Sequence, residues 1–425
     1  MLKKDPKAKD GVRAPLPGEI MKNPALAQTF RALAAEGKKG FYHGRVAEEL
    51  VKVVQDLGGY LSLDDLKYHA ETGSQEVDAI ALKFTGQDIE AKQTAGTDDK
   101  PNQGIYVWEH PPNGQGIVAL MALGILEALE RKGKIPKFAE CQHNSAEYLH
   151  ALIESLRIAF ADATWWVTDP DTAGSDVPST EKLLSRDYLA QRAELFDPLR
   201  AADPLGHGNP AVRNHSDTVY FAVTDRYGNG ISFINSNYGG FGTAIIPRGC
   251  GFTLQNRGAN FALAPSSSES GGKSHPNLLA PRKRPYHTII PAMITNVSDD
   301  TLHTVYGVMG GFNQPQGHVQ VLLNMLAFKH HPQAALDAPR FCIGAGSGSS
   351  SEEASNQLPI VYVEEGISDE AVVGLRRLGH RIEVLSGWQR GMFGRGQVIR
   401  AHYDDGMLVY SAGSDLRGDG MAIPL

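Results

Sequence analysis

A threonine at the start of a β-rich run is the residue in this sequence best placed to act as a nucleophile. Residues 214–243 read NHSDTVYFAVTDRYGNGISFINSNYGGFGT, in which Thr218 follows a Ser-Asp pair and opens the run TVYFAV. A hydroxyl is a weak nucleophile that needs an adjacent base. If the bond before Thr218 were cut, its freed α-amine could serve as that base. The local pattern allows either such an N-terminal nucleophile or an ordinary strand residue.

The sequence lacks the motifs of several other kinds of site. The glycine pair in MGGFNQPQG (309–317) has no phosphate-loop lysine, and no GxSxG nucleophile elbow is present. The histidines in KHHP (329–332) follow a helical pattern, where solvated side chains are common. The three cysteines have neither metal-ligand nor redox spacing, so we expect buried free thiols at Cys141, Cys250 and Cys342. We expect no metal and no cofactor.

The bulk composition is that of a globular protein. The 425 residues are 41% hydrophobic and 21% charged, with a net charge of −7. This balance does not favour nucleic acid or an anionic membrane as a partner. No apolar run approaches the ~20 residues of a membrane span. The basic N-terminus is not followed by the apolar core of a signal peptide, so we expect a cytoplasmic or still unassigned location.

The elements that must position Thr218 change in type along the chain. The first half shows helical periodicity and the second half shows β-rich runs, which together favour one layered α/β body. Asn144 and Glu147 have the spacing of a capping box. Loops rich in Ser and Gly are expected at 264–277 and 344–356, and a flexible segment is expected at 205–217. The expected helices are 23–37, 41–59, 113–131, 144–163 and 317–330, and the expected strands are 218–223, 230–235, 251–256 and 304–310.

Many blocks in the same order resemble the γ-glutamyltransferase family of N-terminal nucleophile (Ntn) hydrolases, which cut themselves and then cleave γ-glutamyl amides. In the first half these blocks include LPGEIMKNPALAQTFRALAAEGKKGFYHG, HPPNGQG and ESLRIAFADATWWVTDP. In the second half they include the 217–243 stretch, GFTLQNRGANF, RKRPYHTIIPAM, VMGGFNQPQGHVQVLLNML, LDAPRF, GRGQVI and GSDLRGDGMA. The fold that the resemblance implies is a four-layer αββα sandwich.

The resemblance implies roles for particular residues. Thr218 matches the catalytic threonine, so the self-cleavage bond would be Asp217–Thr218. Ser236 matches a threonine whose hydroxyl contacts the nucleophile, although it could also be an ordinary strand serine. Gly310 and Gly311 match the pair whose N–H groups form the oxyanion hole, and they could equally be a strand-to-helix turn. The large-subunit-like portion would be 1–217 and the small-subunit-like portion 218–425, and the two fragments would stay associated as one Ntn-hydrolase body.

The expected substrate pocket departs from the γ-glutamyl pattern. The positions that hold the substrate α-amino group as Asn, Gln and Asp are here Tyr238, Arg257 and Asn260. Two serines that hold the α-carboxylate are here His287 and Thr288, which can still donate hydrogen bonds to an anion. These changes favour an anionic acyl group that lacks a free α-amino group. Arg257 and His287 could instead only pack against the adjacent turn.

Three functions remain open. The first is a γ-glutamyltransferase-like, self-processing enzyme of glutathione metabolism, which passes a γ-glutamyl or related acyl group to water or an amine. The second is an acylase or oxamate-type amidohydrolase acting on a small-molecule amide, such as a dicarboxylic monoamide. The family's large subunit begins with an arginine-bearing segment that this chain does not contain, so we expect an N-terminally truncated sequence. An uncut binding or scaffold protein is therefore the third possibility.

Overall fold

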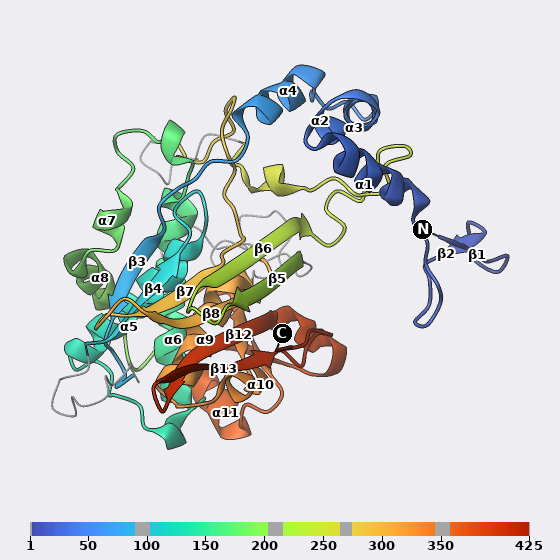
Figure 1. Cartoon of the computed structure of the whole chain (residues 1–425). Helices are drawn as coiled ribbons and strands as arrows, with labels where there is room; N and C mark the ends of the chain where they lie inside the picture. Colours follow the sequence, from blue (N-terminus) through green and yellow to red (C-terminus); the bar gives the residue numbers. More distant parts are fainter. Residues whose placement is uncertain (1, 90–102, 203–215, 264–273, 345–357, 425) are drawn as a thin grey trace. The chain divides into compact units, whose positions relative to one another are not determined.

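The chain forms two compact units, and the boundary predicted at 217/218 lies inside the larger one. The computed structural model describes residues 2–89, 103–202, 216–263, 274–344 and 358–424 (Figure 1). The smaller unit comprises Met1–Val77 and Phe241–Asn256, and the larger comprises Asp78–Gly240 and Arg257–Leu425. The 217/218 boundary stays a prediction about processing. Most of the loops expected at 205–217, 264–277 and 344–356 lie outside the described residues.

The smaller unit is a set of helices with an irregular segment against them. Asn23 accepts a hydrogen bond from the Leu26 N–H (3.1 Å) and so caps the first helix, as its position before Pro24 predicts. The helix expected over 41–59 is interrupted at His43, whose backbone is extended. The helices are α1 (Pro24–Glu36), α2 (Lys39–Tyr42), α3 (Gly44–Asp56) and α4 (Leu63–Thr72), and a short pair of strands is β1 (Lys3–Lys4) and β2 (Val12–Arg13).

The strand predicted at 251–256 is wrong. Phe252 and Leu254 pack against the small core of α3 and α4 rather than against a neighbouring strand. The backbone beside them bonds to α1, because the Gly251 carbonyl accepts from the Asn23 side chain (2.7 Å) and the Cys250 carbonyl accepts from Thr29 Oγ1 (2.9 Å). These long-range contacts occupy polar groups that a ladder would otherwise use.

The larger unit is built on a six-stranded antiparallel sheet with β8 near its centre (Figure 1). The strand order is β13-β12-β8-β7-β4-β3, and each neighbouring pair is antiparallel. This order brings the two ends of the unit's sequence into one sheet, on either side of β8. The strands are β3 (Ile80–Phe84), β4 (Ile105–Glu109), β7 (Ala292–Asn296), β8 (Leu302–Met309), β12 (Arg395–Asp404) and β13 (Met407–Ser414).

Apolar helices cover one face of this sheet. A Cβ atom on Gly317 of α9 would lie 2.7 Å from Val308 Cγ1, so this helix approaches β8 at a glycine. The mixed α/β class is thereby confirmed. The helices of the larger unit are α5 (Gly116–Arg131), α6 (Ala146–Trp166), α7 (Thr180–Leu183), α8 (Arg186–Arg192), α9 (Asn313–Leu326), α10 (Pro332–Asp337) and α11 (Asp369–Arg377).

Two smaller features differ from expectation. Helix α6 is capped by Ser145 rather than by Asn144, whose side chain donates to the Pro339 carbonyl. Cys141 is exposed rather than buried.

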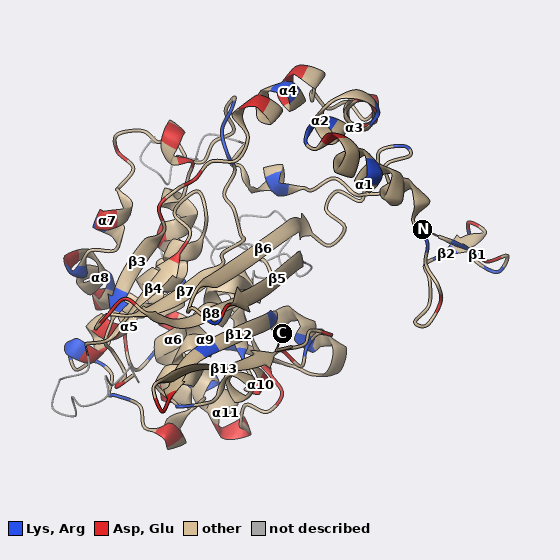
Figure 2. Ribbon diagram, viewed as in Figure 1, with Lys and Arg blue, Asp and Glu red and all other residues tan. Residues whose placement is uncertain are grey.

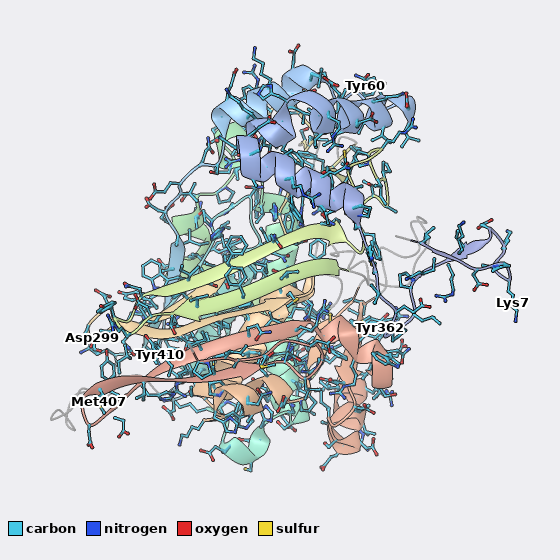
Figure 3. All side chains as sticks on the ribbon, turned by 45° about the vertical axis from the view of Figure 1, so that its right-hand side comes forward. Lys7, Tyr60, Asp299, Tyr362, Met407 and Tyr410 are labelled. Atoms are coloured by element: carbon cyan, nitrogen blue, oxygen red, sulfur yellow. The ribbon has the colours of Figure 1, made fainter. Side chains whose placement is uncertain are left out.

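A two-stranded ribbon lies on the opposite face of β8. It consists of β5 (Ser216–Thr224) and β6 (Gly230–Gly239), and β6 carries no charged residue (Figure 2). The Tyr220 ring of β5 covers Gly307 of β8. Gly230, which pairs with Thr224 farther along β5, packs against Val305 of β8. Higher residue numbers on β5 therefore face lower numbers on β8, so the two strands run in opposite directions. The hydroxyl of Tyr410 on β13 donates to the Asp225 carbonyl in the ribbon's turn (2.7 Å; Figure 3).

A three-stranded sheet and a buried ion-pair network complete the larger unit. The strands are β9 (Phe341–Ile343), β10 (Ile360–Glu364, which carries Tyr362 in Figure 3) and β11 (Arg381–Leu385). Arg340 donates to Asp415 Oδ2 (2.5 Å), and Arg417 donates to both Asp415 and Glu364. The sequence blocks LDAPRF and GSDLRGDGMA therefore supply a structural network in which buried charges are paired.

Candidate active site

Thr218 is buried near the start of β5, opposite Ser236 of β6. The two residues are cross-strand partners, and the ladder register shifts between Asp217 and Thr218. Thr218 is only 2% exposed. A bulge bends its strand and re-aims the side chains beside it. The irregularity thus coincides with the bond at which self-cleavage was predicted.

The packing of the ribbon directs Thr218 to the end of β8. Tyr220 covers Gly307 and belongs to one apolar cluster with Met309. Side chains two residues apart in a strand point to the same face, and β5 runs opposite to β8. Thr218 comes two residues before Tyr220 and points to the same face. It therefore lies level with the end of β8, where the chain continues to Gly310.

Gly310 and Gly311 form the turn between β8 and α9. Their φ values are 144° and 59°, a conformation that side-chain-bearing residues rarely adopt. The Asn313 N–H donates to the Gly310 carbonyl (3.0 Å), and the Gln314 N–H donates to the Gly311 carbonyl (3.2 Å). The turn thus leads directly into the N-terminus of a helix, where backbone N–H groups attract negative charge.

Hydrogen bonds join the predicted residues into one network. Ser236 Oγ accepts from the Tyr238 N–H (2.7 Å) and from Arg257 Nη2 (3.0 Å). Arg257 Nη1 also donates to the hydroxyl of Thr288. The network continues through Gln115, whose Nε2 donates to the Thr288 carbonyl (2.7 Å) and to the Gly311 carbonyl (2.8 Å).

Arg257 is a buried cation without an anionic partner among the described residues. It is 4% exposed and lies in a short 3₁₀ turn, Arg257–Asn260. Its guanidinium carbon is 4.9 Å from the centre of the Tyr238 ring, close enough for a cation–π contact. Burial lowers the pKa of Arg257 to about 10, and its Nε has no hydrogen-bond partner. The side chain remains charged at neutral pH, and its partners in the described part of the chain are two hydroxyls and an aromatic ring.

His287 is neutral and oriented by the backbone. Its Nδ1 accepts from the Ile289 N–H (3.2 Å), so the proton of the neutral ring is on Nε2. Burial, followed by the charge of Arg257, lowers the pKa of His287 to about 3. Asn260 is tied elsewhere, because its Nδ2 donates to the Tyr286 carbonyl (3.0 Å).

The structure thus places the ten predicted site residues, including Asp217 of the cleavage bond, in one part of the larger unit, and it adds residues that the sequence did not single out. Gln115 is fully buried, and its Oε1 accepts from the Tyr286 hydroxyl (3.2 Å). Tyr286 stacks on Phe312, which follows the glycine pair (5.7 Å between ring centres). Gln115 lies in the block HPPNGQG, but nothing in that block indicates a partner at 288 or 311. A separate cavity of about 370 Å³ beside β3 and α5 contains none of these residues.

One group of buried side chains has donor atoms close enough for a metal ion. His150, Glu154 and His380 place these atoms within 4.8 Å of one another. The group is already internally bonded: His150 Nδ1 lies 2.7 Å from His380 Nε2, and Glu154 accepts from Arg157 (2.5 Å). The cation of Arg157 also opposes a further positive charge. We therefore assign this group a structural role.

Known proteins with the same architecture identify the class. The model of the family described as gamma-glutamyltranspeptidase matches residues 7–425. The glutathione hydrolase-like YwrD proenzyme of Bacillus subtilis (strain 168) is 33% identical over 97% of this chain and 67% of its own length. The oxamate amidohydrolase proenzyme of Klebsiella pneumoniae is 31% identical over 96% of this chain and 66% of its own length. The crystal structure of cephalosporin acylase from Bacillus halodurans is 35% identical, with a TM-score of 0.74, over 96% of this chain and 64% of that one.

The chain therefore belongs to the gamma-glutamyltranspeptidase family, and the resemblance inferred from the sequence blocks is confirmed. The chain spans about two thirds of the length of the relatives it matches. Those relatives bear the names of amide-hydrolysing enzymes and proenzymes. Among the described residues, no helix is both long and apolar enough to cross a membrane.

Proposed function

We propose that this chain is a self-processing amidohydrolase with Thr218 as its nucleophile. The main support is the position of Thr218, which is buried on β5 beside a register shift and opposite Ser236, level with the end of β8, where the chain continues to Gly310. That arrangement supplies a hydroxyl, a second hydroxyl and a helix-terminal turn at one place. Water or an amine would accept the acyl group.

Self-processing would begin at the Asp217–Thr218 bond. The Thr218 hydroxyl attacks the Asp217 carbonyl carbon, the C–N bond breaks and an ester forms, with the proton passing to the released α-amine. Water then cleaves the ester and regenerates the hydroxyl. The fragments 1–217 and 218–425 would stay associated, because strands β3 and β4 lie in the same sheet as β7 and β8.

The same groups would then serve turnover. Thr218 attacks the substrate amide, its α-amine takes the hydroxyl proton and returns it to the leaving amine, and water hydrolyses the resulting ester. Such acid–base help is worth roughly 10²–10⁴-fold. Ser236 Oγ already accepts two hydrogen bonds, so its own hydrogen is available to donate to Thr218. The N–H groups of Gly310 and Gly311 would hold the oxyanion, each worth about 2.7–4 kcal/mol.

The finer fold that suits this mechanism is the four-layer αββα sandwich of Ntn hydrolases. The helices, the six-stranded sheet and the ribbon supply three successive layers. The outer face of the ribbon bears exposed apolar side chains, including Phe221 (45%) and Phe233 (47%). A further helical layer over this face would bury them.

Substitution of the nucleophile tests the proposal. Thr218→Ala is expected to abolish both self-cleavage and amide hydrolysis, while Thr218→Ser, which keeps a hydroxyl, retains both at reduced rate. The assays are a denaturing gel and ammonia or amine release from a γ-glutamyl anilide and from a dicarboxylic monoamide. Hydrolysis that survives in Thr218→Ala would refute the mechanism.

A further inference from the structure

The buried charge of Arg257 indicates what the acyl group must carry. An unpaired charge in a protein interior is strongly unfavourable. Two hydroxyls and an aromatic ring satisfy Arg257 only in part, and none of the described residues accepts a hydrogen bond from its Nε–H. Because a guanidinium presents donors that match a carboxylate, the group that completes this site is an anion brought by the substrate.

The same site offers no place for an ammonium group. Its side chains are hydroxyls, rings, amides and one guanidinium, and no carboxylate of the described residues forms an ion pair with Arg257. The position that is an aspartate in the γ-glutamyl pattern is here Asn260, whose amide nitrogen donates to the Tyr286 carbonyl. An α-amino group placed beside Arg257 would therefore meet like charge without compensation. The acyl group is expected to bear a carboxylate and no free amine.

The distances limit the length of that acyl group. Thr218 and Ser236 are opposed across the ribbon, and the Cβ atoms of such a pair lie roughly 5 Å apart. Arg257 Nη2 is a further 3.0 Å from Ser236 Oγ. A reacting carbonyl lies about 3.2 Å from its nucleophile, and a bound carboxylate oxygen lies about 2.8 Å from a guanidinium nitrogen. Between the reacting carbonyl and the bound carboxylate, this leaves room for little more than one or two carbon–carbon bonds.

We propose that the site takes short dicarboxylic monoamides, with the free carboxylate on Arg257 and the amide carbonyl at Thr218. This inference rests on the proposed function of Thr218. In the reaction, the amide C–N bond breaks as the Thr218 ester forms, and ammonia leaves with the proton from the hydroxyl. Water then cleaves the ester to release a dicarboxylate. The neutral His287 offers its Nε2–H as a second donor for the anion.

A series of substrates tests the charge and the length together. For the purified protein, kcat/KM for oxamate or malonamate is expected to exceed that for succinamate, for glutaramate and for L-glutamine by at least about tenfold. Malonamate is expected to exceed acetoacetamide, in which a methyl group replaces a carboxylate oxygen, by about 10–100-fold. Arg257→Gln is expected to reduce the ratio of kcat/KM for malonamate to that for acetoacetamide to nearly one, whereas Arg257→Lys is expected to keep part of this ratio. A preference for L-glutamine, or a ratio that Arg257→Gln leaves unchanged, would overturn the assignment.

A binding measurement separates this inference from the nucleophile. Calorimetry on the wild-type protein is expected to show malonate binding that is lost in Arg257→Gln, while glutamate binds more weakly to both. If malonate binds selectively but no amide is hydrolysed, the anion site stands and the proposed function fails. If self-cleavage and hydrolysis occur but malonate binds no better than glutamate, the proposed function stands and the anion site is wrong. Absence of both selective binding and hydrolysis would overturn the two together.

Discussion

Replacing Gln115 with Met should disturb the active site more than it disturbs the fold. Gln115 is fully buried and donates to the carbonyls of Thr288 and Gly311. Met has similar length but neither donor nor acceptor, so the Thr288 carbonyl and the Tyr286 hydroxyl lose this partner, while Gly311 keeps its bond from the Gln314 N–H. An orphaned buried carbonyl costs about 1–3 kcal/mol and a lost hydrogen bond about 0.5–1.5 kcal/mol. We expect the free energy of unfolding to fall by about 2–4 kcal/mol.

The catalytic effect follows from the same two bonds. They hold Gly311 and Thr288 in register, and a displacement of roughly 1 Å in a site can reduce the rate about 10²-fold. We therefore expect kcat to fall by about 10–100-fold, measured on correctly folded protein, with a smaller change in KM.

Gln320→Met is the matched control for this substitution. Gln320 is also buried, and its amide donates to the carbonyls of Gln316 (2.9 Å) and Phe341 (3.1 Å), away from the nucleophile. The control should lose comparable stability by urea denaturation and keep its kcat. Equal loss of kcat in both variants, or an unchanged kcat in Gln115→Met, would refute the role assigned to Gln115.

Three further predictions concern the second hydroxyl, pH and the buried ion pairs. Ser236→Ala removes one of the two hydroxyls that accept from Arg257 and should lower kcat/KM about tenfold, whereas Ser236→Thr should recover most of it; equal rates for the two would contradict the role of the hydroxyl. Burial lowers the pKa of His303 to about 3, below its unfolded value of about 6.5, so its stabilising effect is present above pH 6.5 and lost as pH falls toward 3. His303→Gln should therefore reduce the dependence of unfolding free energy on pH in that window by about 1.4 kcal/mol per pH unit, measured by urea denaturation at pH 5 and 7, and an unchanged slope would show that His303 does not titrate this way. Asp415→Asn leaves Arg340 without its buried anionic partner and should destabilise the protein by about 3–5 kcal/mol, whereas Lys52→Ala, at an exposed pair with Asp56, should leave stability nearly unchanged; similar losses in the two would contradict the ion-pair argument.

The sequence predicted local features best where neighbouring residues determine them. Asn23 before Pro24 is a helix cap, and the runs after Thr218 and Gly230 are the two strands of the ribbon. The collinear blocks predicted the family and grouped residues as distant as 218 and 311. Each of these features depends on a short pattern or on a resemblance, and neither requires knowledge of long-range packing.

Other features depend on contacts that no local pattern contains. The 251–256 run is apolar at Phe252 and Leu254 like a strand, but those side chains pack on helices. The helix expected from Asn144 begins one position later, because the Asn144 amide bonds to Pro339, distant in sequence. Gln115 belongs to the site through its hydrogen bonds to the carbonyls of Thr288 and Gly311, which are distant in sequence and which no local pattern indicates.

Intact-mass spectrometry of the purified, incubated protein shows whether Thr218 becomes a free N-terminus. Two fragments are expected whose masses sum to that of the chain plus one water, and N-terminal sequencing should show that the smaller begins at Thr218. The Thr218→Ala variant should remain one chain under the same conditions. A wild-type protein that hydrolyses its amide substrate while remaining a single uncut chain would show that Thr218 does not act as an N-terminal nucleophile.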